Sequence, residues 1–318
     1  ECARASNGTL TLEDLTNHAS EWIDPISIDY HNSCLHEMPP NGQGLAALIA
    51  LGILRHHDIK NYPVDSAEAV HLQIEAMKIA FDEAHRHIAD PEYMSLPYTE
   101  FLKPAFLAHQ AKKIKMDRAS HHLSTIPTDH GTVYLSTADK NGMMVSFIQS
   151  NYLGFGSGIV VPNTGISMQN RGFGFTVKKG HPNCVGGGKR PYHTIIPGFV
   201  TYKDRPLMSF GVMGGHMQPQ GHVQVVAGMA DDGLDPQTIL DRPRFCLVGG
   251  RPDGKVALEE GIPESTMDTL ESMGHEIVPV SGFERSIFGK GHVIMQDRSN
   301  GVLWGGSDPR GDGCAMTL

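Results

Sequence analysis

Hydrophobic and polar residues follow different periods in two parts of the chain. In residues 1–127 the apolar positions recur mostly at helical spacing, and the clearest helix begins near Asp65, with Glu68 completing a capping box. Pro91 is expected to end this helix because proline cannot continue the backbone hydrogen-bond pattern. The predicted apolar face comprises Val70, Ile74, Met77, Phe81 and Ile88.

Three further segments of this part have patterns of their own. Thr11 and Asp14 resemble the start of a capped helix that runs toward Trp22. Residues 45–54 form an uninterrupted apolar run, which fits a buried helix. The polar, basic run 112–122 is expected to be an exposed connector.

From Thr132 onward the pattern changes to short β-rich runs separated by Gly and Asn turns. The predicted strands cover 133–135, 144–148, 158–161, 197–201 and 293–295. Helices are predicted over 223–229 and 265–273. A helical N-terminal part followed by a β-rich C-terminal part indicates a layered α+β fold.

The hairpin that begins at Thr132 allows two registers. If the Asn-Gly pair 141–142 forms a two-residue turn, Thr132 faces Asn151. If residues 140–142 form a three-residue loop, Thr132 faces Ser150 on the same side of the sheet. A shift of one residue moves every side chain to the other face, so the two registers differ in what lies beside Thr132.

Composition excludes several classes of protein. The chain has 318 residues, 40% of them hydrophobic, and a net charge of -9 without blocks of like charge, so no nucleic-acid partner is expected. No apolar run reaches the length of a membrane span. The five cysteines and 18 histidines lack metal-ligand spacing, so neither a metal site nor a disulfide framework is predicted.

The sequence starts at Glu1 and assigns no compartment; a cytoplasmic location is the default, with the periplasm or secretion left open.

Gly131 and Thr132 form a candidate self-cleavage site. A threonine hydroxyl needs a base to become a nucleophile, and a threonine at a chain N-terminus has its own α-amino group for this purpose. Cutting after Gly131 would create that amine. On these residues alone, Gly131 can equally be a loop residue and Thr132 a β-branched residue that starts a strand.

A series of motifs in a fixed order resembles the gamma-glutamyltranspeptidase family of N-terminal-nucleophile (Ntn) hydrolases. The series runs TLTLEDL, HLQIEAMKIAFDEAHRHIADP, GTVYLSTADKNGMMVSFIQSN, FGSGIVVPNTGISMQNR, GKRPYHTIIP, GVMGGHMQPQ, DRPRF, LEEGIPE and GGSDPRGDGCA. The resemblance implies a four-layer αββα sandwich. It also implies that residues 1–131 are the C-terminal part of a large subunit and residues 132–318 the small subunit, intertwined as one structural domain. The family precursor is longer at its N-terminus than this chain.

The resemblance also assigns catalytic roles. Thr132 matches the nucleophile that self-cleavage exposes, and Ser150 matches a hydroxyl that hydrogen-bonds it, which favours the register in which the two face each other. Gly214 and Gly215 match the glycine pair whose amides form the oxyanion hole. No cofactor is implied.

The substrate-binding segment departs from the family pattern. The family's amine-binding Asp falls on Gly174 of this sequence. The family's Gln or Glu, which comes earlier in the same segment, falls on Arg171, directly after Asn170. The paired serines that hold a carboxylate in the family fall on His193 and Thr194.

A substrate-contacting Asn of the family falls on Tyr152. The set suits a carboxylate and not an α-ammonium group, which places the chain nearer the amidohydrolase and acylase branch. An Arg171→Gln, Gly174→Asp double change is expected to restore part of the amine site. In an alternative interpretation, Arg171 lies on the surface and the ammonium is held elsewhere.

The predicted function is therefore that of an amide hydrolase or acyltransferase that acts on a small carboxylate-bearing amide, with water or an amine as acceptor. The expected product of cleavage is a heterodimer, which could itself dimerise. One alternative is a true gamma-glutamyltransferase or glutathione hydrolase. Another is an uncleaved, non-catalytic scaffold or binding protein.

Overall fold

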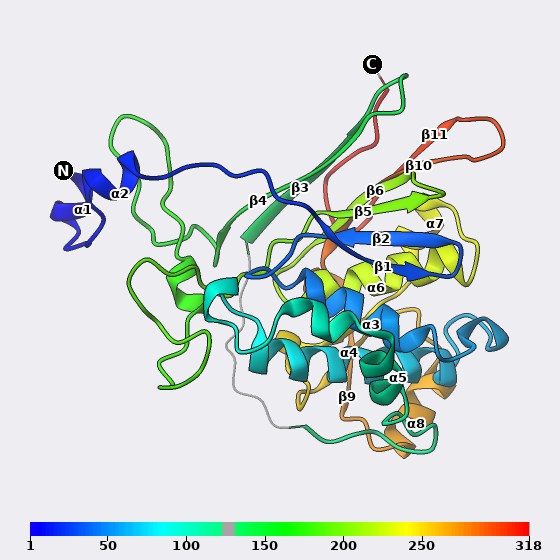
Figure 1. Cartoon of the computed structure of the whole chain (residues 1–318). Helices are drawn as coiled ribbons and strands as arrows, with labels where there is room; N and C mark the ends of the chain where they lie inside the picture. The colour runs from blue at the N-terminus through cyan, green and yellow to red at the C-terminus, as the bar shows by residue number, and fades with distance from the viewer. Residues whose placement is uncertain (123–130, 318) are drawn as a thin grey trace.

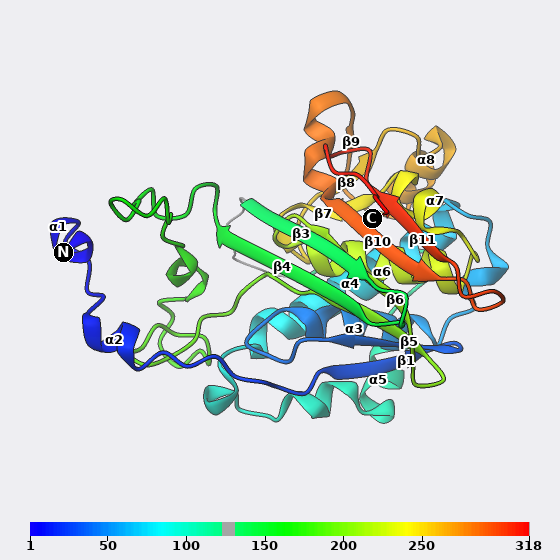
Figure 2. The same cartoon turned by 90° about the horizontal axis from the view of Figure 1, so that it is seen from above.

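A six-stranded antiparallel sheet forms the centre of the protein. The computed structural model describes residues 1–122 and 131–317. The strands lie in the order β1-β2-β5-β6-β10-β11 (Figures 1 and 2). Their bounds are β1 Ile26–Tyr30, β2 Ser33–Glu37, β5 Gly198–Tyr202, β6 Arg205–Met213, β10 Lys290–Gln296 and β11 Leu303–Ser307. The hairpin of β1 and β2 comes from the part predicted as helical, so the sheet combines strands from both parts of the chain.

Helices cover one face of this sheet. The helices α3 (Gly44–Leu54) and α6 (Met217–Ala230) contact the strands, and α4 (Ala67–His87) packs on α3 (Figure 1). Every residue of α3 is buried, as the apolar run predicted. The predicted apolar face of α4 is also buried. Its cap is one residue later than predicted, since Ser66 accepts the hydrogen bond from the Ala69 N–H.

The remaining elements surround this core. They are the helices α1 Cys2–Ala5, α2 Leu12–Thr16, α5 Pro104–Ala111, α7 Pro236–Asp241 and α8 Glu264–Ser272, the strands β7 Phe245–Leu247, β8 Val256–Glu259 and β9 Ile277–Val280, and the 3-10 turns η1 Ile59–Asn61, η2 Pro91–Tyr93, η3 Tyr98–Leu102, η4 Arg171–Gly174, η5 Val248–Gly250 and η6 Gly282–Phe288. No helix among the described residues is both long and apolar enough to cross a bilayer.

Three predictions for these segments need correction. The capping box of α2 is present, but the helix ends at Thr16 and Trp22 is fully exposed. Residues 158–161 contribute one isolated bridge, between Val160 and Ser167, in place of a strand. The connector 112–122 is anchored as well as exposed: Ile114 and Ala119 are buried.

A hairpin of β3 (Gly131–Ala138) and β4 (Met144–Tyr152) forms a second β layer across β6 and β10 (Figure 2). Serine hydroxyls join the two layers: Ser136 Oγ lies 2.9 Å from Ser209 Oγ, and Ser146 Oγ donates to the Phe210 carbonyl at 3.1 Å. The hairpin is therefore fixed on the central sheet by polar contacts as well as by packing.

The opposite face of this hairpin is apolar and uncovered in the described part of the chain. Val133, Leu135, Val145 and Phe147 are 68%, 44%, 44% and 50% exposed. Helices, central sheet and hairpin are thus three of the four layers expected for an αββα sandwich, and no described helix forms the outer layer.

Candidate active site

Thr132 and Ser150 face each other at the open end of the β3–β4 hairpin. The strands pair Thr132 with Ser150 and Ala138 with Met144. Gly142 completes the three-residue loop with a φ of 88°, a value that glycine adopts at little cost. The second of the two registers is therefore confirmed, and it places both hydroxyls on the face that looks toward the central sheet.

The two hydroxyls are close enough to interact. Thr132 Oγ1 donates to Ser150 Oγ at 3.3 Å, slightly longer than a typical O–H···O hydrogen bond. Ser150 Oγ also accepts the Tyr152 N–H at 2.9 Å, which fixes the serine side chain. Tyr152 itself has a φ of 79°, a strained value for a residue with a side chain and one that clusters at functional sites.

The end of β6 lies at the same level as Thr132. Ser136 contacts Ser209, and Tyr134 lies against Gly211, where an added Cβ would come within 2.4 Å of the tyrosine ring. From this pair, two residues back along β3 and two residues forward along β6 place Thr132 level with Met213, the last residue of β6. The next two residues are the candidate oxyanion-hole glycines.

Gly214 and Gly215 connect β6 to the start of α6. Their φ values are 131° and 57°, in the region that favours glycine. Their carbonyl oxygens accept hydrogen bonds from the N–H groups of Met217 and Gln218 and so begin the helix. A helix N-terminus carries partial positive charge, so this location suits an oxygen that becomes negative during a reaction.

Arg171 lies beside the hydroxyl pair, at the start of η4. Its Nη2 donates to the Ser150 carbonyl oxygen at 3.3 Å, and its guanidinium lies 5.6 Å from the centre of the Tyr152 ring. Its Nη1 is buried and has no hydrogen-bond partner among the described residues. The Arg171 side chain is therefore partly buried, and its Nη1 makes no hydrogen bond to the described residues.

His193 is a second residue here with a buried ring nitrogen. Burial, together with the nearby charge of Arg171, lowers the pKa of His193 to about 4, so the ring is neutral at pH 7. Its Nδ1 has no hydrogen-bond partner in the described part of the chain. In the tautomer with a proton on Nδ1, His193 can donate to a carboxylate oxygen.

The other predicted substrate-binding residues have different surroundings. Asn170 uses its Oδ1 to accept the Leu153 N–H at 3.1 Å, so this oxygen joins the end of β4 to η4. Thr194 is buried, and its carbonyl accepts a hydrogen bond from Gln43. Sequence reasoning missed Gln43; the only signal was a polar residue directly before a completely apolar helix.

A cavity of about 630 Å³ opens next to this group. Tyr152, Gly174, Tyr192 and His216 belong to its lining. Because Tyr152 borders both the hydroxyl pair and the cavity, the cavity offers room for part of a bound molecule.

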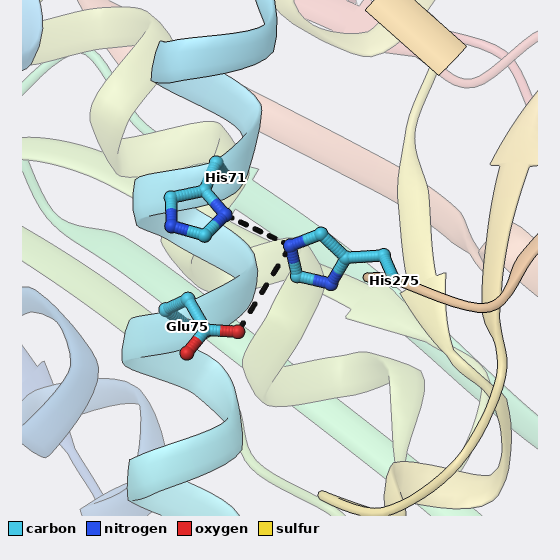
Figure 3. Close-up of side chains that lie close together, drawn as sticks. All are labelled: His71, Glu75 and His275. Carbon is cyan, nitrogen blue, oxygen red and sulfur yellow. Dashed lines mark hydrogen bonds and ion pairs between the residues drawn. The ribbon is translucent and has the colours of Figure 1, made fainter. Parts of the chain in front are cut away.

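His71, Glu75 and His275 form a second polar cluster, which is the one place among the described residues where ligand groups for a metal gather (Figure 3). The His71 Nε2–H donates to the Lys115 carbonyl at 2.8 Å, so His71 Nδ1 accepts from His275 Nε2, also at 2.8 Å. His275 Nδ1 then accepts from Lys78 Nζ at 3.2 Å.

This arrangement does not suit a divalent cation. Binding through His71 Nδ1 and His275 Nε2 would move the proton of His275 to Nδ1, where it would face the Lys78 ammonium. Lys78 also occupies Glu75 Oε1, at 2.9 Å. Every proton of the cluster has an acceptor without a metal, so the cluster is best described as a buried hydrogen-bond network.

The sequence matches the model of the gamma-glutamyltranspeptidase family over residues 1–318. It is 33% identical over 318 residues to the glutathione hydrolase-like YwrD proenzyme of Bacillus subtilis, covering 98% of this chain and 59% of that protein. It is also 33% identical over 313 residues to the oxamate amidohydrolase proenzyme of Klebsiella pneumoniae, covering 96% and 57%.

The structure is similar to that of a cephalosporin acylase from Bacillus halodurans. The two share 46% identity with a TM-score of 0.90, over 98% of this chain and 56% of the acylase chain. The chain thus spans a little over half the length of the relatives that it matches. Its fold is that of the Ntn hydrolases, and the chain belongs to the gamma-glutamyltranspeptidase family.

Proposed function

We propose that this chain is the catalytic part of an amide hydrolase or acyltransferase that matures by cutting its own Gly131–Thr132 bond. The observation that carries the proposal is the pairing of Thr132 with Ser150, with their hydroxyls 3.3 Å apart, at the level where β6 ends and Gly214 begins. The two relatives with 33% identity are both named proenzymes, which supports a maturation step.

The proposed reaction has two stages. Thr132 Oγ1 attacks the amide carbon while the new α-amine of Thr132 takes its proton. The amides of Gly214 and Gly215 stabilise the oxyanion, the C–N bond breaks, and the departing nitrogen takes the proton from the α-amine. Water then attacks the threonine ester, releasing the acid and restoring the Thr132 hydroxyl; an amine acceptor in place of water gives a new amide.

The substrate that fits best is an amide whose acyl group bears a carboxylate and no α-amine. Arg171 Nη1 and His193 Nδ1 are buried and have no hydrogen-bond partner among the described residues. With the His193 proton on Nδ1, a carboxylate can accept from both. An α-ammonium group would instead lie near a guanidinium without a countercharge at Gly174.

The double substitution suggested by the sequence cannot rebuild the amine site. A Cβ at Gly174 would lie 2.3 Å from the Tyr192 carbonyl oxygen, a backbone atom that cannot move aside cheaply. Aspartate therefore does not fit at this position without a change in the backbone. This obstacle supports a substrate without an α-amine.

After cutting, residues 1–131 and 132–318 would remain together as a heterodimer. Strands β1 and β2 come from the first segment and pair with β5 from the second through Cys34, Leu35 and His36. Separating the segments would expose the interior of the central sheet.

Two measurements test the proposal. Mass spectrometry of the full-length protein should detect a chain that begins at Thr132, and Thr132→Ala should abolish both cutting and turnover. The mature protein should hydrolyse glutaryl-p-nitroanilide with a higher kcat/KM than γ-glutamyl-p-nitroanilide. A tenfold preference for the γ-glutamyl compound, about 1.4 kcal/mol, would contradict the proposed substrate class, and an active Thr132→Ala protein would contradict the mechanism.

A further inference from the structure

Gln43 makes hydrogen bonds to two separate loops of the candidate site with one side-chain nitrogen. It is completely buried in the turn between β2 and α3. Its Nε2 donates to the Thr194 carbonyl at 2.7 Å and to the Gly215 carbonyl at 2.7 Å. An amide nitrogen has two hydrogens, so both are used.

The orientation of this amide is fixed by its chemistry. The Gln43 Oε1 accepts from the Tyr192 hydroxyl at 3.1 Å. Rotating the amide by half a turn would place Oε1 against two carbonyl oxygens that cannot donate. Only one orientation satisfies all three contacts, and it holds the side chain in a single place.

The backbone around Gln43 is held to the same loop. The Gln43 N–H donates to the His193 carbonyl at 3.0 Å, and the His193 N–H donates to the Asn41 carbonyl at 3.2 Å. Asn41 Nδ2 in turn donates to the Pro191 carbonyl at 2.6 Å. The turn before α3 and the loop that carries His193 are therefore paired along their length, so Gln43 moves with His193.

We propose that Gln43 is a positioning residue, which sets the separation between the carboxylate-binding His193 and the oxyanion-hole glycines. The inference rests on the function proposed above. The hydrogen bonds of Gln43 reach Thr194, Gly215, Tyr192 and His193, so it would act through these residues. It acts by holding the Gly215 peptide, at a φ of 57°, in register with the loop of His193. Acyl transfer needs the two ends of the substrate held at a set distance, and a shift of one ångström can lower a rate on the order of 100-fold.

A purely structural role would give a different result from a positioning role. Removing this amide takes one hydrogen bond from each of two carbonyls, although the Gly215 carbonyl keeps its bond from the Gln218 N–H, and lowers the melting temperature in either case. The measurement that separates the two roles is kcat per mature site. It is compared between variants of Gln43 and a variant of a matched glutamine elsewhere in the protein.

Gln224 is that control. Its Nε2 donates to the carbonyls of Gln220 and Phe245 at 3.0 and 3.2 Å, and its Oε1 accepts the Phe245 N–H at 3.1 Å. Like Gln43, it donates to two backbone carbonyls and accepts one hydrogen bond, but its acceptor oxygen faces a backbone N–H in place of a tyrosine hydroxyl, and it joins α6 to β7.

The experiment compares Gln43→Leu, Gln43→Glu and Gln224→Leu in the full-length protein. Glutamate preserves the shape of glutamine but presents oxygen to two carbonyls. For each variant one measures the melting temperature, the fraction cut at Thr132, and kcat and KM for glutaryl-p-nitroanilide per mature chain. Both Gln43 variants should lower kcat on the order of 10- to 100-fold, while Gln224→Leu should lower the melting temperature and leave kcat within about twofold of the unmodified protein.

If a Gln43 variant folds but is not cut, the rate of cutting replaces kcat, and normal cutting in Gln224→Leu supports the inference. Equal kcat values for the Gln43 variants and Gln224→Leu would overturn it. Absence of cutting and turnover in the unmodified protein would instead refute the proposed function.

Discussion

At the scale of single residues, the site consists of groups whose hydrogen-bonding capacity is only partly used. Arg171 gives one nitrogen to the Ser150 carbonyl and keeps Nη1 without a partner among the described residues. Buried donors are ordinarily paired, and an unpaired one costs about 1–3 kcal/mol or more. The acyl carboxylate of the proposed substrate would remove that cost for Arg171.

The role of Arg171 leads to the first prediction. Arg171→Met should lower kcat/KM for glutaryl-p-nitroanilide on the order of 10- to 100-fold, because a hydrogen bond to a charged group contributes about 1.5–3 kcal/mol. The control is Arg298→Met, since Arg298 also lies over a tyrosine ring, that of Tyr202 at 4.5 Å, but is exposed and belongs to another part of the protein. Equal kcat/KM values for the two variants would show that Arg171 does not bind the acyl carboxylate.

At the scale of elements, the β3–β4 hairpin determines which hydroxyl lies beside Thr132. Its register depends on the three-residue loop that ends at Gly142, whose φ of 88° is costly for any residue with a side chain. A two-residue turn would instead pair Thr132 with Asn151. The side chains of Thr132 and Ser150 would then lie on opposite faces of the hairpin. The loop therefore controls the site from the far end of the hairpin.

Gly142→Ala should lower the free energy of unfolding by about 1–2 kcal/mol through backbone strain alone, since open space surrounds the added Cβ. Gly187→Ala is the matched control, because Gly187 is equally open but has no left-handed φ. Urea denaturation of both variants measures the difference. Equal midpoints would show that the loop adopts another conformation in solution.

Sequence reasoning predicted the long-range plan of the elements better than their edges. The apolar run of α3 and the face of α4 follow from burial, and the pairing of Thr132 with Ser150 followed from the family motifs. The β1–β2 hairpin was missed because the alternation of buried and exposed residues in β1 covers only a short strand. The strand that pairs with β2, β5, is also distant in the sequence. Gln43 could not be predicted because its role depends on carbonyls brought close only by folding.

At the scale of the whole molecule, several buried histidines are kept neutral by the fold. Burial and the neighbouring charge of Lys78 lower the pKa of His275 to about 3. Burial also lowers the pKa of His85 to about 4. His85 lies near the end of α4, and one of its ring nitrogens is buried.

These shifts predict loss of stability in acid. The unfolded chain takes up protons on these histidines below about pH 6.5, while the folded protein does so only near pH 3–4. The contribution of these histidines to the free energy of unfolding should therefore be fully present above about pH 6.5. It should fall as the pH decreases, by up to about 1.4 kcal/mol per pH unit for each histidine. Urea titrations from pH 7 to pH 4 measure this slope.

His275→Gln should reduce the slope, because glutamine can still accept from Lys78 and donate to His71 without titrating. The control is His109→Gln, which removes an exposed histidine in place of a buried one. An unchanged slope in His275→Gln would show that His275 is protonated in the folded protein.

The central sheet, built from segments on both sides of Gly131–Thr132, has a consequence for the kinetics of folding. While the bond is intact, β2 and β5 find each other within one polymer, so recovery from denaturant is a first-order process that does not depend on protein concentration. Once the bond is cut, the same pairing requires a collision between two molecules, and recovery becomes second-order. Dilution should then slow the return of the mature protein without affecting uncut Thr132→Ala. The uncut precursor would thus fold readily at any concentration. After self-cleavage, the denatured protein would regain its native state efficiently only at high concentration.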